Sequence, residues 1–105
     1  MNNRLDIAQE FADKINSDDI KQIILFGSVA RGDDSKDSDI DILIVSNNSK
    51  KIEPKITAEV FNVILNNKEF ISAHVMSENK LNTVALPFFS AFSTAALSFL
   101  LNPLP

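Results

Sequence analysis

The chain has 105 residues, enough for one hydrophobic core but not for two, so we expect a single domain spanning 1–105. Its formal net charge is −4, whereas proteins that bind long DNA or RNA usually carry an excess of lysine and arginine. An acidic surface is compatible with a small nucleotide accompanied by metal ions. The absence of cysteine excludes disulfides and thiol nucleophiles, and the first ten residues lack a secretory pattern, so we expect a cytoplasmic protein.

The first part of the chain predicts a helix followed by two strands. Apolar residues recur at helical spacing in the opening segment, at Leu5, Ala8, Phe11, Ala12 and Ile15. The β-branched and apolar stretch from Ile20 to Phe26 predicts a strand that ends at Gly27. A short helical turn over 28–31 and a polar loop over 32–38 precede a second strand over 40–45, which we expect to be buried on both faces beyond its start.

The second part predicts a further helix and strand. Pro54 suits the first turn of a helix that runs to about Lys68. A third strand follows from Phe70 to Met76, and Ser77 can cap a final helical region that is interrupted or restarted at Pro87. The order αβαβαβα predicts an α/β sandwich of the α+β kind, in which helices cover a small three-stranded mixed sheet.

The C-terminal segment, 81–105, contains no charged residue. Residues 84–101 are mostly apolar or small, a length that barely reaches the lower limit for a membrane span. Because serine, threonine and proline lower its hydrophobicity and no lysine or arginine flanks it, we favour a buried or partner-covered helix over a span. An exposed patch of this size predicts self-association or a protein partner.

Two aspartates stand at the start of the second strand. Asp39 and Asp41 are two residues apart, so their side chains share one face at about 6–7 Å. At that distance two carboxylates repel by roughly 2.5 kcal/mol at an effective dielectric of about 20, which a divalent cation would offset. Hard oxygen ligands favour Mg²⁺ or Mn²⁺, although an isolated pair of this kind can also be a solvated strand end.

A glycine and a serine directly follow the first strand. Gly27 lacks a Cβ, so backbone amides there can approach a phosphate, and Ser28 can add a hydroxyl to the same oxygens. The pattern is not a P-loop, and Gly-Ser alone is also compatible with a plain turn. The inference therefore depends on combining this turn with the two aspartates.

Together the two motifs read GSVARG over 27–32 and SDIDILIV over 38–45, each at the edge of an apolar strand. This combination resembles the minimal nucleotidyltransferases, a branch of the DNA polymerase β-like nucleotidyltransferase superfamily. The resemblance implies that fold, with Gly27 and Ser28 holding the phosphates of ATP and with Asp39 and Asp41 as the catalytic metal ligands. Arg31 would support the loop or meet a phosphate, and pairing of Arg31 with a nearby aspartate is the alternative.

The third strand departs from the family pattern. Active members carry a third carboxylate there, whereas the stretch from Phe70 to Met76 has none, and Ser72 and His74 take the positions that face the site. His74 can act as a general base or be an ordinary edge histidine. Glu69 stands at the entrance of the strand and is a further carboxylate that can reach the site. The departure puts catalysis in question but leaves nucleotide and metal binding intact.

Two functions follow. The first is an enzyme that transfers AMP from ATP to a protein or small-molecule acceptor. Stand-alone minimal nucleotidyltransferases of this size also resemble the antitoxin halves of toxin–antitoxin pairs, whose partners are small helical proteins, and some of them modify that partner with AMP. The second function is therefore a catalytically impaired binding module that neutralises a helical toxin by direct contact.

Overall fold

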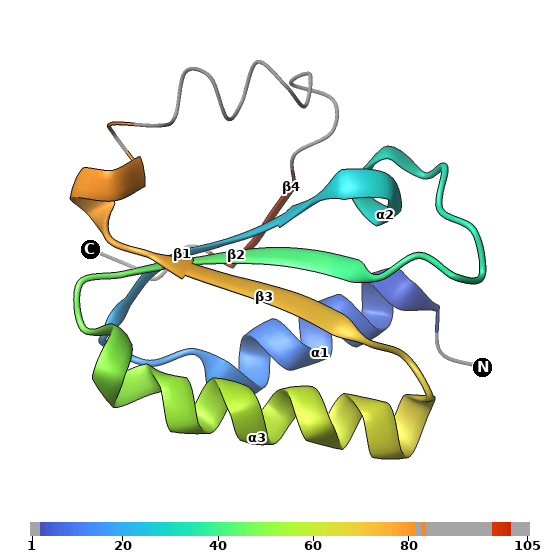
Figure 1. Cartoon of the computed structure of the whole chain (residues 1–105), viewed down its shortest axis with the longest axis horizontal. Coiled ribbons are helices and arrows are strands. Elements are labelled where there is room, and N and C mark those ends of the chain that lie inside the picture. Colours follow the sequence, from blue (N-terminus) through green and yellow to red (C-terminus); the bar gives the residue numbers. More distant parts are fainter. Residues whose placement is uncertain (1–2, 82, 84–97, 102–105) are drawn as a thin grey trace.

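The computed structural model describes residues 3–81, 83 and 98–101 (Figure 1). A mixed sheet of four strands in the order β3-β2-β1-β4 forms its centre. β2 runs parallel to β3 and antiparallel to β1, and β4 runs antiparallel to β1. The elements in chain order are α1 (Arg4–Ile15), β1 (Ile20–Phe26), α2 (Gly27–Arg31), β2 (Ile40–Ser46), α3 (Ser49–Asn67), β3 (Ile71–Met76) and β4 (Ser98–Leu101).

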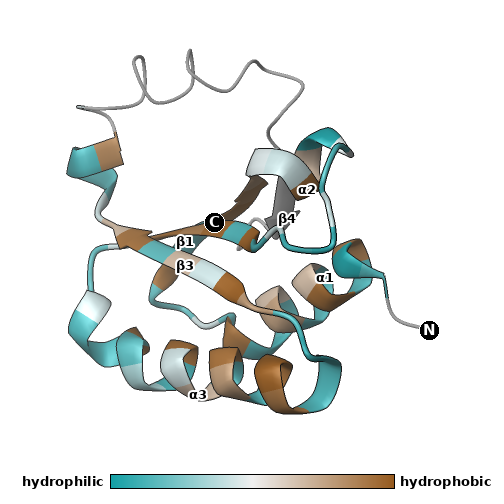
Figure 2. Cartoon of the chain, turned by 45° about the vertical axis from the view of Figure 1, so that its right-hand side comes forward, coloured by the Kyte–Doolittle hydropathy of each residue, from teal (hydrophilic) through white to brown (hydrophobic). Residues whose placement is uncertain are grey.

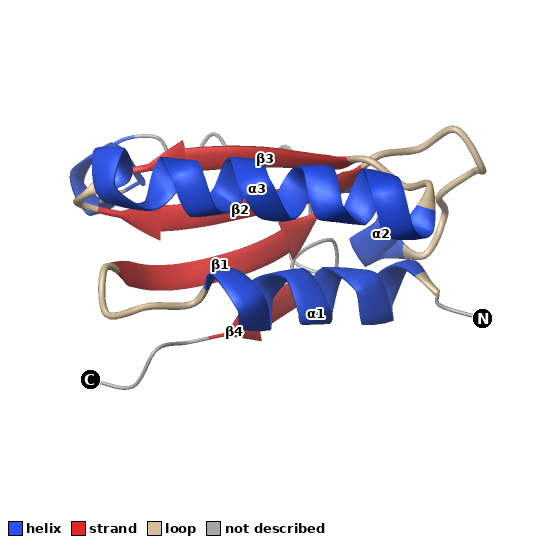
Figure 3. Cartoon of the chain, turned by 90° about the horizontal axis from the view of Figure 1, so that it is seen from below, coloured by secondary structure: helices blue, strands red, loops and turns tan. Residues whose placement is uncertain are grey.

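Helices α1 and α3 lie side by side on one face of the sheet (Figure 3). The apolar side chains of both helices pack there against alternate residues of the strands, which form the main core. Figure 2 shows hydrophilic and hydrophobic residues side by side on the helices, and Phe61 and Leu65 of α3 are among the exposed hydrophobic residues. The fully buried strand residues of this core are Ile20, Ile23, Leu25, Ile40, Ile42, Ile44 and Ile71.

The opposite face of the sheet carries a second, smaller apolar cluster. Ile24, Phe26, Leu43 and Val45 are buried there, and Met76 and Leu81 pack against them. β1 and β2 are therefore buried on both faces over most of their length, as the continuous apolar run of β2 predicted. Asp41 shares this face, because it alternates in step with Leu43 and Val45 along β2.

The predicted α+β class and the three predicted strands are confirmed, but the sheet is larger than expected. Residues 98–101 form β4, where the sequence had predicted helix, and β4 pairs with β1 at Ile23, Ile24 and Leu25. The pairing provides hydrogen-bond partners for this edge of β1, a non-local gain that the local pattern does not reveal. The predicted restart at Pro87 lies outside the described residues.

The start of the last predicted helix is confirmed. The Ser77 hydroxyl accepts a hydrogen bond from the Lys80 backbone N–H at 3.1 Å, and helical residues follow Ser77. Within the described part of the chain, no helix is long and apolar enough to cross a membrane.

The prediction that Pro54 lies in the first turn of α3 is wrong. The helix begins at Ser49, and Pro54 lies inside it on the exposed side. The reason is Ile52, which is buried one turn before Ile56 and packs into the main core. The helix ends at Asn67, close to the predicted position, and Lys68 takes a left-handed conformation there.

Candidate nucleotide and metal site

The end of β1 and the start of β2 meet at Gly27 and Asp41. Phe26 pairs with Asp41 in the antiparallel register, so the turn at Gly27 lies beside the Asp41 side chain. Gly27 has φ +79°, and a Cβ at this position would overlap the Asp41 carboxylate, with Cγ at 3.1 Å. Only glycine suits both the backbone conformation and this close approach. Two motifs that are separated in sequence therefore share one location.

The Asp41 carboxylate is half-buried and electrostatically strained. Burial is the main cause that raises the pKa of Asp41 above its usual range, and the charge of Asp39 raises it further. The charges of His74 and Arg31 lower this pKa, but the net shift is upward. Asp39 itself is exposed at the mouth of the same strand. An ionised Asp41 is thus held where it is poorly solvated, and a bound cation would relieve this cost.

β3 brings Ser72 and His74 to the same face. Ser72 is the register partner of Asp41, and His74 is the partner of Leu43. The Ser72 hydroxyl and His74 Nε2 are 3.3 Å apart, and the His74 ring lies 5.7 Å from the ring of Phe26. Among the described residues, no group of three or more aspartate, glutamate, histidine or cysteine side chains is arranged to hold a metal. The two acidic residues that the sequence predicted as metal ligands lie directly before β2, at Asp39, and within it, at Asp41.

Ser28 and Arg31 belong to α2, which follows Gly27. The Ser28 carbonyl accepts hydrogen bonds from the backbone N–H groups of Gly32 and Asp33, at 2.9 and 3.0 Å, and these bonds close the short helix. Arg31 pairs with Asp33 at 3.1 Å on the surface, which is the alternative that the sequence left open. Its charge still reaches Asp41, whose pKa it lowers.

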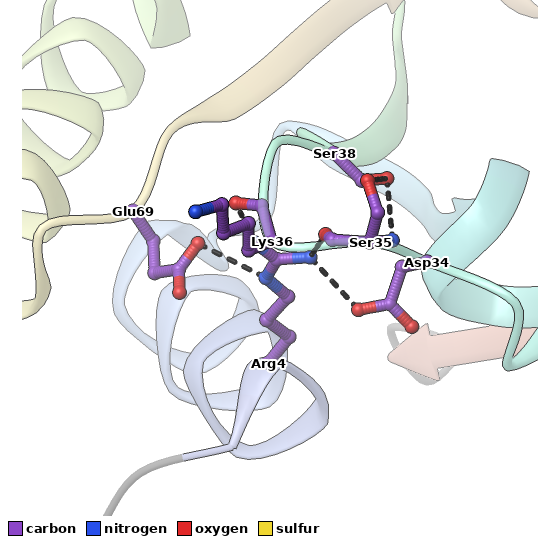
Figure 4. A network of polar contacts seen from close by, with 6 residues as sticks. All are labelled: Arg4, Asp34, Ser35, Lys36, Ser38 and Glu69. Carbon is purple, nitrogen blue, oxygen red and sulfur yellow. Dashed lines mark hydrogen bonds and ion pairs between the residues drawn. The ribbon is translucent and has the colours of Figure 1, made fainter.

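Sequence reasoning missed Arg4, which reaches from α1 to the loop that precedes Asp39 (Figure 4). Glu69 does not point into the site; its carboxylate pairs with Arg4 at 3.0 Å. The available hint was the position of Arg4, because a basic residue in the first turn of a helix is opposed by the helix dipole and needs another reason to be there.

Comparison with known proteins places the chain in a family. The family model described as "Nucleotidyltransferase domain" matches residues 6–86, most of the chain. The chain belongs to the nucleotidyltransferase domain family. The predicted nucleotidyltransferase resemblance is thereby confirmed at the level of the family.

Individual relatives agree with this assignment. A stretch of 26 residues is 77% identical to a Methanocaldococcus jannaschii protein named "Putative protein adenylyltransferase", but it spans only 25% of this nucleotidyltransferase chain and 26% of that protein. A crystal structure described as a "putative nucleotidyltransferase" from Sulfolobus solfataricus has a TM-score of 0.58 at 22% identity, covering 94% of this chain and 80% of the other.

A second solved structure, described as a "toxin-antitoxin with AMP-PNP", has a TM-score of 0.59 at 13% identity and covers 95% of this chain and 74% of the other. At these low identities the two structures establish the shared fold. The predicted nucleotidyltransferase fold is thus confirmed.

Proposed function

We propose that this nucleotidyltransferase uses ATP and Mg²⁺, or Mn²⁺ in its place, to transfer AMP to a hydroxyl group of a protein or small-molecule acceptor. The observation that carries the proposal is the contact between Gly27 and the half-buried Asp41 carboxylate. This contact places two features side by side. One is a turn that can accommodate phosphate oxygens, and the other is a carboxylate that is poorly solvated because it is partly buried. A cytoplasmic location, where ATP is available, is part of the proposal.

The residues present fit a magnesium ion. Asp39 and Asp41 offer hard oxygen ligands, and Mg²⁺ in nucleotide sites is typically held by one or two carboxylates together with substrate phosphates. When bound, the metal would neutralise charge on the phosphate oxygens during transfer. Two aspartates at the site are therefore sufficient for metal-assisted nucleotide binding.

The remaining groups have roles that follow from their positions. The absence of a side chain at Gly27 leaves room for the Asp41 carboxylate beside the turn, and the Ser28 hydroxyl can donate to phosphate oxygens bound there. In the transfer, the acceptor oxygen forms a bond to the α-phosphorus, the bond to the β-phosphate oxygen breaks, and pyrophosphate leaves. The proton of the acceptor hydroxyl must go to a base, and His74 is the basic group that β3 places on this face.

Labelled ATP tests the proposal. The chain is incubated with Mg²⁺ and cell lysate together with ATP labelled either at the α- or at the γ-phosphate. We expect label transfer from α-labelled ATP alone, and loss of transfer in Asp41→Asn. Asp37→Asn is the matched control, because Asp37 is an exposed carboxylate of the loop before β2. Transfer that persists in Asp41→Asn would refute the role assigned to the site.

A second candidate function is motivated by the solved structure described as a "toxin-antitoxin with AMP-PNP", which shares this fold, and by β3, where Ser72 and His74 rather than carboxylates are the register partners of Asp41 and Leu43. We propose in addition that the chain acts as the antitoxin half of a toxin–antitoxin pair, with a small helical protein as partner. The partner is then either the acceptor of AMP or is neutralised by contact alone.

The double variant Asp39→Asn/Asp41→Asn separates these two possibilities when it is co-expressed with a candidate helical toxin. Survival of the cells without ATP binding by the variant favours neutralisation by contact. Loss of both cell survival and ATP binding in the variant favours modification of the partner. Failure of the wild-type chain to protect against the toxin would refute the antitoxin proposal.

A further inference from the structure

The guanidinium of Arg4 joins three separate segments of the chain (Figure 4). Nε donates to Glu69 Oε1 at 3.0 Å, and Nη1 donates to Asp34 Oδ2 at 2.8 Å and to the carbonyl oxygen of Ser35. Nη2 donates to the carbonyl oxygen of Lys36 at 2.8 Å. Only 13% of the Arg4 side chain is exposed. One side chain at the start of α1 therefore connects the loop before β2 with the segment before β3.

The loop that Arg4 holds has little other support from outside itself. Its residues from 32 to 37 are all exposed, so apolar packing contributes little to its position. Ser35 and Ser38 bond to each other, through the Ser35 N–H at 2.9 Å and the Ser38 N–H at 3.1 Å, which shapes the turn but does not fix it to the rest of the fold. The bonds from Arg4 fix it to α1.

Asp39 lies directly after this loop, so its position depends on the loop. The next residue, Ile40, donates its backbone N–H to the carbonyl of Phe70 at 3.0 Å, and Phe70 follows Glu69, the other partner of Arg4. The hydrogen-bond partners of Arg4 thus lie just before β2 and just before β3, on both sides of the point where the two strands begin to pair. Loss of the Arg4 bonds to either segment would therefore displace Asp39 before it displaces the buried part of β2.

We propose that Arg4 is a positioning residue that sets the place of Asp39 relative to Asp41 and Gly27, and so controls the affinity for Mg²⁺ and ATP. The inference rests on the proposed function. Arg4 acts through the loop and through Glu69. Its planar fork is needed because the partners are two carboxylates and two carbonyls in different directions, which a lysine ammonium cannot satisfy together.

Two measurements on the full chain test the inference. Hydrogen exchange of the metal-free protein reports the order of residues 34–39, and calorimetric titration with ATP in the presence of Mg²⁺ reports affinity. In Arg4→Gln we expect faster exchange confined to 34–39 and 69–70, and about tenfold weaker binding of ATP. Arg4→Lys keeps the charge but not the fork, so it should not restore affinity. Lys51→Gln removes an exposed ion pair with Asp19 and serves as the control with both properties unchanged.

Each outcome decides a definite point. Wild-type affinity in a folded Arg4→Gln variant would overturn the inference and leave the proposed function standing. Failure of the wild-type chain to bind ATP with Mg²⁺ would overturn both. Exchange that rises throughout β1 and β2 would show that Arg4 maintains the whole fold, which also overturns a positioning role. If Arg4→Gln does not fold, Asp34→Asn takes its place, because it weakens only the bond from Arg4 to Asp34. This variant should also show faster exchange and weaker ATP binding. If Asp34→Asn changes neither property, the inference is refuted.

Discussion

Replacement of Gly27 by alanine is the most specific structural test of the site. An alanine in a left-handed conformation costs about 1–2 kcal/mol relative to glycine. The new methyl group would also overlap the Asp41 carboxylate, and forced displacement of a packed side chain typically costs about 1–3 kcal/mol. We therefore expect Gly27→Ala to lower the free energy of unfolding by about 2–5 kcal/mol in total, and to weaken ATP binding because Asp41 moves.

Gly32 provides a matched control. It has φ +80°, nearly the same as Gly27, but a Cβ there meets nothing within 4 Å. Gly32→Ala should therefore carry the backbone cost alone, about 1–2 kcal/mol, which for a domain of this size lowers Tm by about 4–16 °C. The difference between the two variants isolates the overlap with Asp41.

Chemical denaturation of four proteins completes the test: wild type, Gly27→Ala, Asp41→Ala and the double variant. Once the carboxylate is removed, the cost of Gly27→Ala should fall to about that of Gly32→Ala, a coupling of about 1–3 kcal/mol between the two positions. Equal costs for Gly27→Ala and Gly32→Ala in the wild-type background would show that the carboxylate does not lie against the glycine, and the reasoning would fail.

Three further predictions concern single charged groups. Burial raises the pKa of Asp41, so ionised Asp41 destabilises the metal-free protein; Asp41→Asn should raise Tm at neutral pH, and melts at decreasing pH should show this advantage shrinking as Asp41 becomes protonated. The hydrogen bond from Asn62 is the main cause that lowers the pKa of Glu59, and it outweighs the opposing effect of burial. Glu59→Gln should therefore lower the free energy of unfolding by about 1 kcal/mol at neutral pH. Thermal melts should show this difference vanishing as the pH falls through the lowered pKa. Arg31→Gln should change stability by less than about 1 kcal/mol because its pair with Asp33 is exposed, yet calorimetry should show weaker ATP binding, with a smaller loss at high salt.

Local pattern was sufficient for the elements that position the site. The apolar run of β2 is buried on both faces and the helical spacing of α1 buries one face, so local pattern identified both elements. The Gly27 turn and the Asp39–Asp41 pair were recognisable because each borders an apolar strand. Their contact required the β1–β2 pairing, which brings Phe26 beside Asp41.

Other features depended on contacts that local pattern does not contain. β4 lies in a stretch of mostly apolar or small residues, where periodicity cannot separate a strand from a helix, and its pairing with β1 decides the outcome. Pro54 suggested a helix start, but burial of Ile52 extends α3 by more than a turn toward its N-terminus. Arg4 finds its partners 30 and 65 positions away, a separation at which a single sequence gives no indication of pairing.

Calorimetric titration of the chain with ATP, with Mg²⁺ and again with excess chelator, tests the central claim most directly. If the Gly27 turn and the two aspartates form one nucleotide and metal site, the wild-type chain binds ATP only with the divalent cation, and Asp39→Asn/Asp41→Asn does not bind at all. ATP binding that survives both the chelator and the double substitution would contradict this account of the site.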